Sequence, residues 1–353
     1  MEWPQFWHLP EEGFLSKILI IIFLTLVCTT DIAAQTKDYY FTVNYAKARP
    51  LAMGGAYMAV EGGLATIFFN PASFRLSSDK QGIRITSFFN PFASASLYSY
   101  YKRDLKKGIS NSEWRNIVKL LPRALVVSSS NWEFVILGHE ELETRRDIHK
   151  NQRFFVADSL FIYSLHSTLL KIRLANQVFI GGTLSYFNSP QSLSFNEHVG
   201  FSYGIYLLPS TKLGVGVVFT DVPNDFKNVF LDYNRIEDGS VNVGISYKPN
   251  PNNNISIDVR NISEEDKLTT REWHFGVEQS FWDHIALRSG YFRSPKDKIN
   301  YFSFGVGLLN LNFSKYGVKK FINPLMALNY SILFENNGGT TNRSHFLSFN
   351  LGF

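Results

Sequence analysis

Residues 343–353 (RSHFLSFNLGF) are the stretch that most constrains the fold of this chain. Large apolar side chains alternate there with small or polar ones, and the large ones are Leu347, Phe349, Leu351 and Phe353. Because successive side chains of a β-strand point to opposite faces, a strand here has one apolar and one polar face. A last strand with aromatic residues outside and small polar residues inside is typical of a bacterial outer-membrane β-barrel. We expect Phe349, Leu351 and Phe353 to form the signal that the barrel-assembly machinery recognises.

Residues 1–34 have the pattern of a secretory signal peptide. Lys17 precedes the apolar run Ile18–Val27, and small residues follow up to Ala34, after which we expect cleavage. The run is shorter than the roughly 20 apolar residues that a membrane-spanning helix needs. Cys28 is the single cysteine, so the mature chain is expected to have none. Val27 directly before Cys28 does not suit lipoprotein processing, and the true start of translation stays open.

Composition agrees with an exported membrane barrel. Aromatic residues make up 16% of the chain and charged residues 18%, whereas average domains have about 25% charged residues. No stretch after residue 35 is apolar enough for a transmembrane helix, and only helices and closed barrels satisfy their backbone in lipid. The net charge of +5 is scattered over turns instead of gathered on one surface, which argues against a nucleic-acid partner.

The alternation predicts an all-β fold, a transmembrane antiparallel barrel of about 14 strands. Strict alternation is clearest in residues 199–207, 213–219 and 326–334. The expected strands are 81–89, 93–101, 123–140, 154–168, 176–188, 198–208, 211–221, 240–249, 253–262, 271–281, 284–294, 299–313, 321–335 and 343–353. Splitting 123–140 at Ser130 would give fifteen, whereas single-chain bacterial barrels have an even number.

The predicted connections alternate between short turns and longer polar loops. Short turns (Pro209–Ser210, Pro249–Asn253, Trp282–Asp283) are expected on the periplasmic side, and the loops 141–152, 221–239, 263–270 and 335–342 on the outer side. Lys102–Pro122 breaks this rule, because it is long but falls on the short side. Its stretch Ser112–Leu121 is predicted to be an amphipathic helix, which either caps the barrel base or binds a partner.

The segment Ala46–Leu76 (AKARPLAMGGAYMAVEGGLATIFFNPASFRL) carries a family resemblance. It resembles the N-terminal region of the outer-membrane superfamily of long-chain fatty-acid transporters (FadL-like), including its PorV/PorQ-like branch. The matching residues are Arg49, Met53, Gly54, Gly55, Ala56, Phe69, Asn70, Pro71 and Ala72. The branch often has acidic residues before its Asn-Pro-Ala element, where this chain has Glu61-Gly62-Gly63. The role of a second carboxylate is therefore in doubt.

The resemblance implies a domain organisation of signal peptide (1–34), N-terminal hatch or plug inside the lumen (35–76) and barrel (77–353). A segment pressed against the wall needs small wall residues, and glycines stand at positions expected to face inward. They are Gly200, Gly204, Gly214, Gly216, Gly244, Gly276, Gly305 and Gly307. Inward glycines also relieve the curvature of a bent sheet, so both explanations stay open.

Six charged or ionisable residues are expected on the lumenal faces of neighbouring strands, namely Lys248, Asp258, Arg260, His274, Glu278 and Arg288. They form either a salt-bridged strut or a polar lining that orients an anionic head group. No catalytic motif occurs, because His166, His198, His274, Ser256 and Asp258 are scattered, so no enzyme, cofactor or metal site is predicted.

Two functions remain. The resemblance implies either an uptake channel for small hydrophobic or amphipathic solutes, gated by the hatch, or a PorV/PorQ-like barrel that serves secretion-system proteins. An apolar lumenal pocket near Asn70–Phe74 would favour transport. A filled lumen with an exposed apolar patch on Trp114–Leu121 would favour the accessory role. The solute, the partner and the oligomeric state are not predicted.

Overall fold

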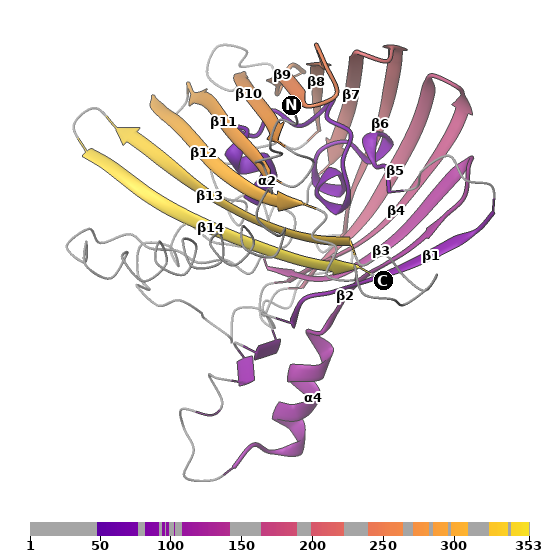
Figure 1. The fold of residues 1–353 in the computed structure, drawn as a ribbon, viewed down its shortest axis with the longest axis vertical. Coiled ribbons are helices and arrows are strands. Elements are labelled where there is room, and N and C mark those ends of the chain that lie inside the picture. Colours follow the sequence, from indigo (N-terminus) through magenta and orange to yellow (C-terminus); the bar gives the residue numbers. More distant parts are fainter. Residues whose placement is uncertain are drawn as a thin grey trace, which may run out of the picture. The chain divides into compact units, whose positions relative to one another are not determined.

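Fourteen antiparallel strands close into one barrel in the order β1-β14-β13-β12-β11-β10-β9-β8-β7-β6-β5-β4-β3-β2 (Figure 1). Each strand therefore pairs with its neighbours in sequence, and β1 closes the ring against β14. This confirms the predicted all-β antiparallel barrel and its strand number. The computed structural model describes residues 48–76, 82–91, 94–95, 97–98, 102, 108–141, 164–188, 199–221, 239–263, 271–281, 285–295, 298–309, 325–337 and 340–352.

The strands are β1 (Arg84–Phe89), β2 (Pro122–Ser128), β3 (Trp132–Glu141), β4 (Ser164–Ala175), β5 (Val178–Asn188), β6 (Val199–Ser210), β7 (Leu213–Asp221), β8 (Ser240–Tyr247), β9 (Asn253–Arg260), β10 (Glu272–Phe281), β11 (Ile285–Ser294), β12 (Ile299–Leu309), β13 (Leu325–Asn337) and β14 (Thr340–Gly352). The signal peptide (1–34), residues 35–47 and Phe353 lie outside the described residues.

The two faces of the wall follow the alternation in the sequence. On β6, Phe201, Tyr203 and Ile205 are 43%, 55% and 45% exposed, whereas the residues between them face inward. Similar outward rows on the other strands give the barrel an apolar outer surface. Its members include Leu184, Val217, Ile245, Ile257, Phe275, Leu287 and Phe304. The predicted sidedness is therefore confirmed for these strands.

Two predicted strands were wrong, and the errors compensate. The described residues between Pro91 and Lys102 are helical, so 93–101 is not a strand. Pro91 favours the start of a helix because its missing N–H is not needed in the first turn. The predicted strand 123–140 is two strands, β2 and β3, joined by a tight turn in which the Ser129 amide donates to the Trp132 carbonyl at 2.8 Å.

The sequence left this split at Ser130 only as an alternative, because β2 and β3 are apolar on both faces. Leu125 and Ile136 face outward, while Val126 and Val135 are buried inside. A continuous apolar run has no break in its periodicity that would mark a turn. The prediction had one strand too many at 93–101 and one too few at 123–140, so its total of fourteen agrees with the structure.

The corrected strand order also moves the loop 90–121. Short links (129–131, 176–177, 211–212, 248–252) lie at one end of the barrel, the short-turn end. The link 90–121 instead joins β1 to β2 at the opposite, long-loop end, together with 142–163, 189–198, 222–239 and 261–271. The exception to the rule of alternating loops thus disappears here. Three other links depart from the rule: 310–324 is long but joins strands at the short-turn end, and 295–298 and 338–339 are short but join strands at the long-loop end.

Strand ends account for the remaining differences. The predicted strand 154–168 corresponds to β4, which runs on to Ala175 before the two-residue turn 176–177. The loop expected at 335–342 is also shorter, because β13 extends to Asn337 and β14 begins at Thr340. Apolar or threonine-rich continuations of each strand keep the ladder paired beyond the predicted ends.

The predicted amphipathic helix is α4 (Asn111–Lys119). Ser110 caps it, since its hydroxyl accepts the Glu113 amide at 3.3 Å and the Glu113 carboxylate accepts the Ser110 amide at 2.6 Å. This reciprocal capping box satisfies the first free amides of the helix. No helix in the described part of the chain has the length and apolar character to cross a bilayer.

Residues Ala48–Leu76, here called the N-terminal segment, lie inside the ring of strands (Figure 1). The segment contains α2 (Ala48–Ala52) and two short 3-10 helices, η1 (Leu64–Phe68) and η2 (Pro71–Ser73). Helix α2 contacts β11 to β14, whereas η2 contacts β4 to β6. The segment therefore follows the inner wall over much of its circumference.

Candidate functional site inside the barrel

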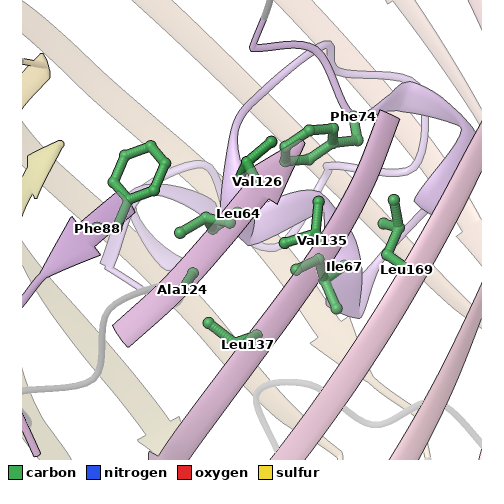
Figure 2. Packing of buried hydrophobic residues seen from close by; sticks show 9 residues of the cluster. All are labelled: Leu64, Ile67, Phe74, Phe88, Ala124, Val126, Val135, Leu137 and Leu169. Atoms are coloured by element: carbon green, nitrogen blue, oxygen red, sulfur yellow. The ribbon is translucent and has the colours of Figure 1, made fainter. Parts of the chain in front are cut away.

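Part of the inner wall of β1 to β4 is apolar, and the N-terminal segment packs on this part. Leu64, Ile67 and Phe74 of the segment meet side chains from four strands (Figure 2). The wall residues of this cluster are Phe88, Ala124, Val126, Val135, Leu137 and Leu169. All nine side chains are buried, so the apolar face of the segment stabilises its docked position by the hydrophobic effect.

The opposite wall, from β5 to β12, carries a groove of glycines under the segment backbone. At seven inward positions an added Cβ would meet atoms of the segment within 3.0 Å, and these are Gly181, Gly204, Gly216, Gly244, Gly276, Gly290 and Gly305. Several are cross-strand partners: Gly181 pairs with Gly204, Gly216 with Gly244, and Gly276 with Gly290. The groove therefore exists because these residues have no side chain, which supports the contact explanation over the curvature one.

Five of the predicted wall glycines are in this groove, and the sequence reasoning missed Gly181 and Gly290. Gly214 and Gly307 instead leave room for wall side chains, Tyr206 and Arg288 respectively. A signal for Gly181 was present in the Gly181-Gly182 pair, where one glycine must face inward. Gly54 and Gly55 of the segment adopt φ of +60° and +75°, a backbone region that favours glycine, and Gly54 lies directly against Gly290.

Wall side chains bind the backbone of the segment between Gly54 and Ala59. One carboxylate oxygen of Asp258 accepts the amides of Tyr57 (2.6 Å) and Met58 (2.9 Å). Further wall groups satisfy the carbonyls: Arg260 donates to Gly55, His274 Nδ1 lies 2.6 Å from the Gly54 oxygen, and the Ser256 and Ser246 hydroxyls donate to Ala56 and Ala59. An irregular backbone inside a barrel has no ladder of its own, so these partners replace it.

Asn70 joins the two halves of the segment to the wall. Its side-chain oxygen accepts the Ala72 amide at 3.0 Å and so caps η2, in which Pro71 takes the first position. Its amide nitrogen donates to the carbonyls of Met58 (2.9 Å) and Ile205 on β6 (3.3 Å). The neighbouring Phe69 ring packs on Tyr57, with ring centroids 5.3 Å apart. The Asn-Pro-Ala element thus has a structural role at this junction.

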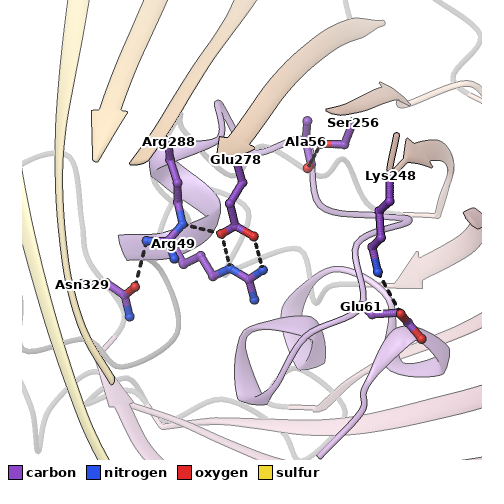
Figure 3. A network of polar contacts seen from close by, with 8 residues as sticks. All are labelled: Arg49, Ala56, Glu61, Lys248, Ser256, Glu278, Arg288 and Asn329. Atoms are coloured by element: carbon purple, nitrogen blue, oxygen red, sulfur yellow. Dashed lines mark hydrogen bonds and ion pairs between the residues drawn. The ribbon is translucent and has the colours of Figure 1, made fainter. Parts of the chain in front are cut away.

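A buried carboxylate ties α2 to the wall near the short-turn end. Glu278 of β10 accepts two hydrogen bonds from Arg49, at 2.7 and 2.9 Å, and one from Arg288 of β11 at 2.5 Å (Figure 3). Arg288 also donates to Asn329 of β13 at 2.9 Å. This arrangement is a bidentate arginine–carboxylate pair with a second guanidinium behind it, a geometry that gives strong charge-assisted hydrogen bonds.

Glu61 forms a second ion-pair cluster, in which its own side chain is 17% exposed. One oxygen accepts a hydrogen bond from Lys248, the residue after β8, at 2.9 Å (Figure 3). The other oxygen accepts one from Arg75 of the segment, also at 2.9 Å. Burial by itself would raise the pKa of Glu61, but the two cations outweigh it and hold that pKa below its ordinary value.

A third pair, Lys171 of β4 with Glu133 of β3, escaped the sequence reasoning. The two groups lie 3.1 Å apart, and both also bind the end of the segment, Lys171 through the Phe74 carbonyl and Glu133 through the Leu76 amide at 3.0 Å. The only signal was one charged residue at an inward position of each strand. A charged residue that faces the lumen needs a hydrogen-bonding partner there. Here the partners include backbone atoms of the N-terminal segment, which only the folded chain brings close.

All six predicted lumenal residues, Lys248, Asp258, Arg260, His274, Glu278 and Arg288, lie on the inner wall, and five of them bind the N-terminal segment directly. The structure brings Ser256, Asp258 and His274 together on β9 and β10, since Asp258 pairs with His274 across the strands. Their hydrogen bonds go to segment backbone atoms. Among the described residues no group of three His, Cys, Asp or Glu side chains is arranged to hold a metal ion.

The neighbouring residues Gly181 and Gly182 provide a matched test of the groove. A Cβ at Gly181 would lie 2.5 Å from the Ala72 amide nitrogen, whereas at Gly182, on the other face, the nearest atom is 3.8 Å away. We expect Gly181→Ala to weaken docking of the segment by about 1–3 kcal/mol, the usual cost of overpacking. Gly182→Ala should change little. Limited proteolysis of the segment measures the effect, and equal protection of both variants would contradict the groove.

Glu61 predicts a dependence of docking on pH. Since its pKa is lower in the docked state than its ordinary value of 4.5, its ion pairs stabilise docking above that value. The stabilisation is lost as the pH falls through the lowered pKa. Planar-bilayer conductance of the wild type should therefore rise between neutral pH and about pH 3. In Glu61→Gln the conductance at neutral pH should already be higher and the further rise smaller; an unchanged rise would exclude Glu61 as the cause.

Comparison with known proteins gives only distant likenesses. No family model matches the chain, and no curated protein matches it. Among solved structures, a triple mutant of the Rhodopseudomonas blastica porin is 10% identical with a TM-score of 0.34, covering 66% of this chain and 76% of its own. A double mutant of the same porin is 9% identical with a TM-score of 0.35, covering 65% and 76%. Scores this low leave the function to be decided by the residues of the site.

Proposed function

We propose that this protein is a bacterial outer-membrane barrel of the fatty-acid-transporter-like superfamily, which takes up small amphipathic solutes when its N-terminal segment moves as a hatch. The outer-membrane location is supported by the apolar outer rows of the strands. Such a surface is unfavourable in water and matches the lipid-facing band of a membrane barrel. The resemblance of Ala46–Leu76 to the FadL-like N-terminal region supports the superfamily.

The division of the inner wall into an apolar and a polar part carries the proposal. One side, β1 to β4, presents the apolar residues that now cover Leu64, Ile67 and Phe74. The other side presents charged groups, among which Lys248 keeps about a quarter of its side-chain surface exposed. A lumen of this kind suits a solute with a hydrocarbon part and an anionic head group.

Uptake then requires exchange of partners. When the segment leaves the wall, an apolar solute replaces its side chains on β1 to β4, and an anionic head group replaces Glu61 at Lys248. The docked segment and the solute compete for the same wall residues. The segment covers the apolar wall with Leu64, Ile67 and Phe74 and binds Lys248 with a carboxylate, as a solute with a hydrocarbon part and an anionic head group would. Solute binding and hatch opening are therefore linked in this proposal.

Proteoliposomes with purified protein test the uptake. A fluorescent long-chain fatty acid should enter them with saturable kinetics, and an unlabelled fatty acid should compete. Gly63→Ala serves as the control variant, because a Cβ there has open space around it, and it should behave as wild type. Mass spectrometry of the protein in mild detergent should find a recurrent lipophile. Uptake that neither saturates nor responds to competition, without a bound lipophile, would overturn the proposal.

One observation favours a second function, a PorV/PorQ-like accessory role in secretion. The helix α4 exposes an apolar stripe of Trp114, Val118 and Leu121, a surface that a partner protein can bind. A protein that co-purifies in constant ratio and is lost with changes in this stripe would support that role.

A further inference from the structure

Helix α4 has three distinct sides: one is apolar and buried, one is apolar and exposed, and one carries cations. Ile117 and Leu120 are buried against the protein, and Ser94 donates to the Ile117 carbonyl at 2.9 Å. Next to this packed side runs the exposed stripe of Trp114, Val118 and Leu121, which are 47%, 60% and 37% exposed. Arg115 and Lys119 lie beside this stripe around the helix axis, and both are exposed.

Helical spacing makes the exposed stripe continuous. Trp114 and Val118 are four residues apart and lie on one face of α4, whereas Ser112 lies on the opposite face. Leu121 follows the helix end, and its amide donates to the Val118 carbonyl at 3.1 Å, so the turn continues the stripe. A helix that is already packed through Ile117 and Leu120 has no need of a second apolar face for its own stability. This second face therefore has to meet an apolar environment outside the protein or remain an unfavourable surface in water.

The stripe continues into the outer surface of the barrel. In Figure 1, α4 leads directly into β2. The outward Leu125 of β2 is 39% exposed and belongs to the apolar exterior. The helix lies at the long-loop end, where the strands leave the apolar band. A helix at this level, with aromatic and aliphatic residues on one side and cations beside them, has the composition of an interfacial membrane helix.

We propose that α4 lies in the headgroup region of the bilayer at the long-loop end of the barrel. Trp114, Val118 and Leu121 enter the boundary of the acyl chains, and Arg115 and Lys119 bind the phosphates of anionic lipids. Tryptophan suits this depth because its ring is apolar and its N–H is a donor. The same surface then serves as a lipid anchor, which removes the main support for a protein partner at α4.

Lipid quenching of single fluorescent labels tests this proposal. The full chain is reconstituted in vesicles of phosphatidylglycerol and phosphatidylcholine, after Cys28→Ser, with an environment-sensitive label on Val118→Cys or on Ser112→Cys. Lipids brominated on their acyl chains should quench the label at position 118 several-fold more than the label at position 112. A label at Ile205→Cys, on the outer face of β6, gives the value for full lipid contact, and heat-modifiable migration shows that each variant is folded.

Two results would overturn the proposal. Equal, weak quenching at positions 118 and 112, with strong quenching by aqueous iodide at both, would place the stripe in water. A label at position 118 that neither brominated lipid nor iodide reaches would show that a protein covers the stripe. A second variant tests the cations, since Arg115→Gln with Lys119→Gln should reduce the quenching at 118 in anionic vesicles but not in purely zwitterionic ones. An equal reduction in both would contradict the phosphate contacts.

Discussion

Deleting residues 35–76 should convert the barrel into an open pore. The deletion removes the described segment from Ala48 to Leu76, which follows the inner wall from β13 round to β3, so its removal leaves the lumen unfilled along that path. The fourteen-strand ladder does not include the segment and should stay closed. We expect a protein that still inserts and is heat-modifiable, with a single-channel conductance well above that of the wild type.

The exposed inner wall explains why the open pore should conduct. Asp258, Lys248, Glu278 and the serines of β8 and β9 lose their segment partners and become available to water. Planar-bilayer recordings of both proteins measure the gain. If the deleted form inserts but conducts no more than the wild type, the N-terminal segment does not close the barrel, and the hatch proposal fails.

The second large effect is expected at Glu278. Glu278→Ala leaves the buried guanidinium of Arg288 and the partly buried one of Arg49 without their shared carboxylate. Removing one partner of a buried ion pair costs about 3–5 kcal/mol, because the remaining charge is uncompensated. Docking of α2 should therefore weaken by about a hundredfold or more. Open-channel probability in bilayer recordings should rise accordingly.

A double-mutant cycle separates the pair from a general loss of stability. Arg49→Ala, Glu278→Ala and the combined variant are compared, and contacting residues of this kind couple by about 0.5–3 kcal/mol. The exposed Glu113 on α4 gives the control, since Glu113→Gln removes a carboxylate charge far from the wall cluster and should leave the open probability unchanged. Strict additivity of the two changes would show that Arg49 and Glu278 do not hold the segment together.

The side on which each strand residue lies was predictable from the sequence for most of the barrel. From β5 to β13 the outward face is apolar and the inward face mostly small or polar, with inward exceptions such as Phe292 and Tyr301. The alternation alone assigns Phe201 outward and Asp258 inward. The prediction weakened at β2 and β3, where Val126 and Val135 are as apolar as their outward neighbours. Their inner face is apolar because it packs on the segment, a contact that lies more than 50 residues away in sequence.

The inward position of the six lumenal ionisable residues was also predictable, but their partners were not. Periodicity placed Asp258 and Glu278 on the inner face, and a salt-bridged strut was one of two explanations. The structure pairs Glu278 with Arg288 and also with Arg49, 229 positions away in sequence. Asp258 binds two backbone amides, for which a sequence has no signal. Lys171 and Glu133 were missed for the same reason.

The sequence by itself determined the barrel class and the sidedness of most strands, because a period of two is a local property of the chain. The predicted strand number was right only because one wrong strand at 93–101 offset the undivided strand 123–140. Only the tertiary structure decided that the helical stretch after β1 is no strand, that the loop 90–121 lies at the long-loop end, and that the wall glycines form a groove for the N-terminal segment. These features depend on contacts between residues far apart in sequence. The free energy of such contacts exists only once the ring of strands has closed around the segment.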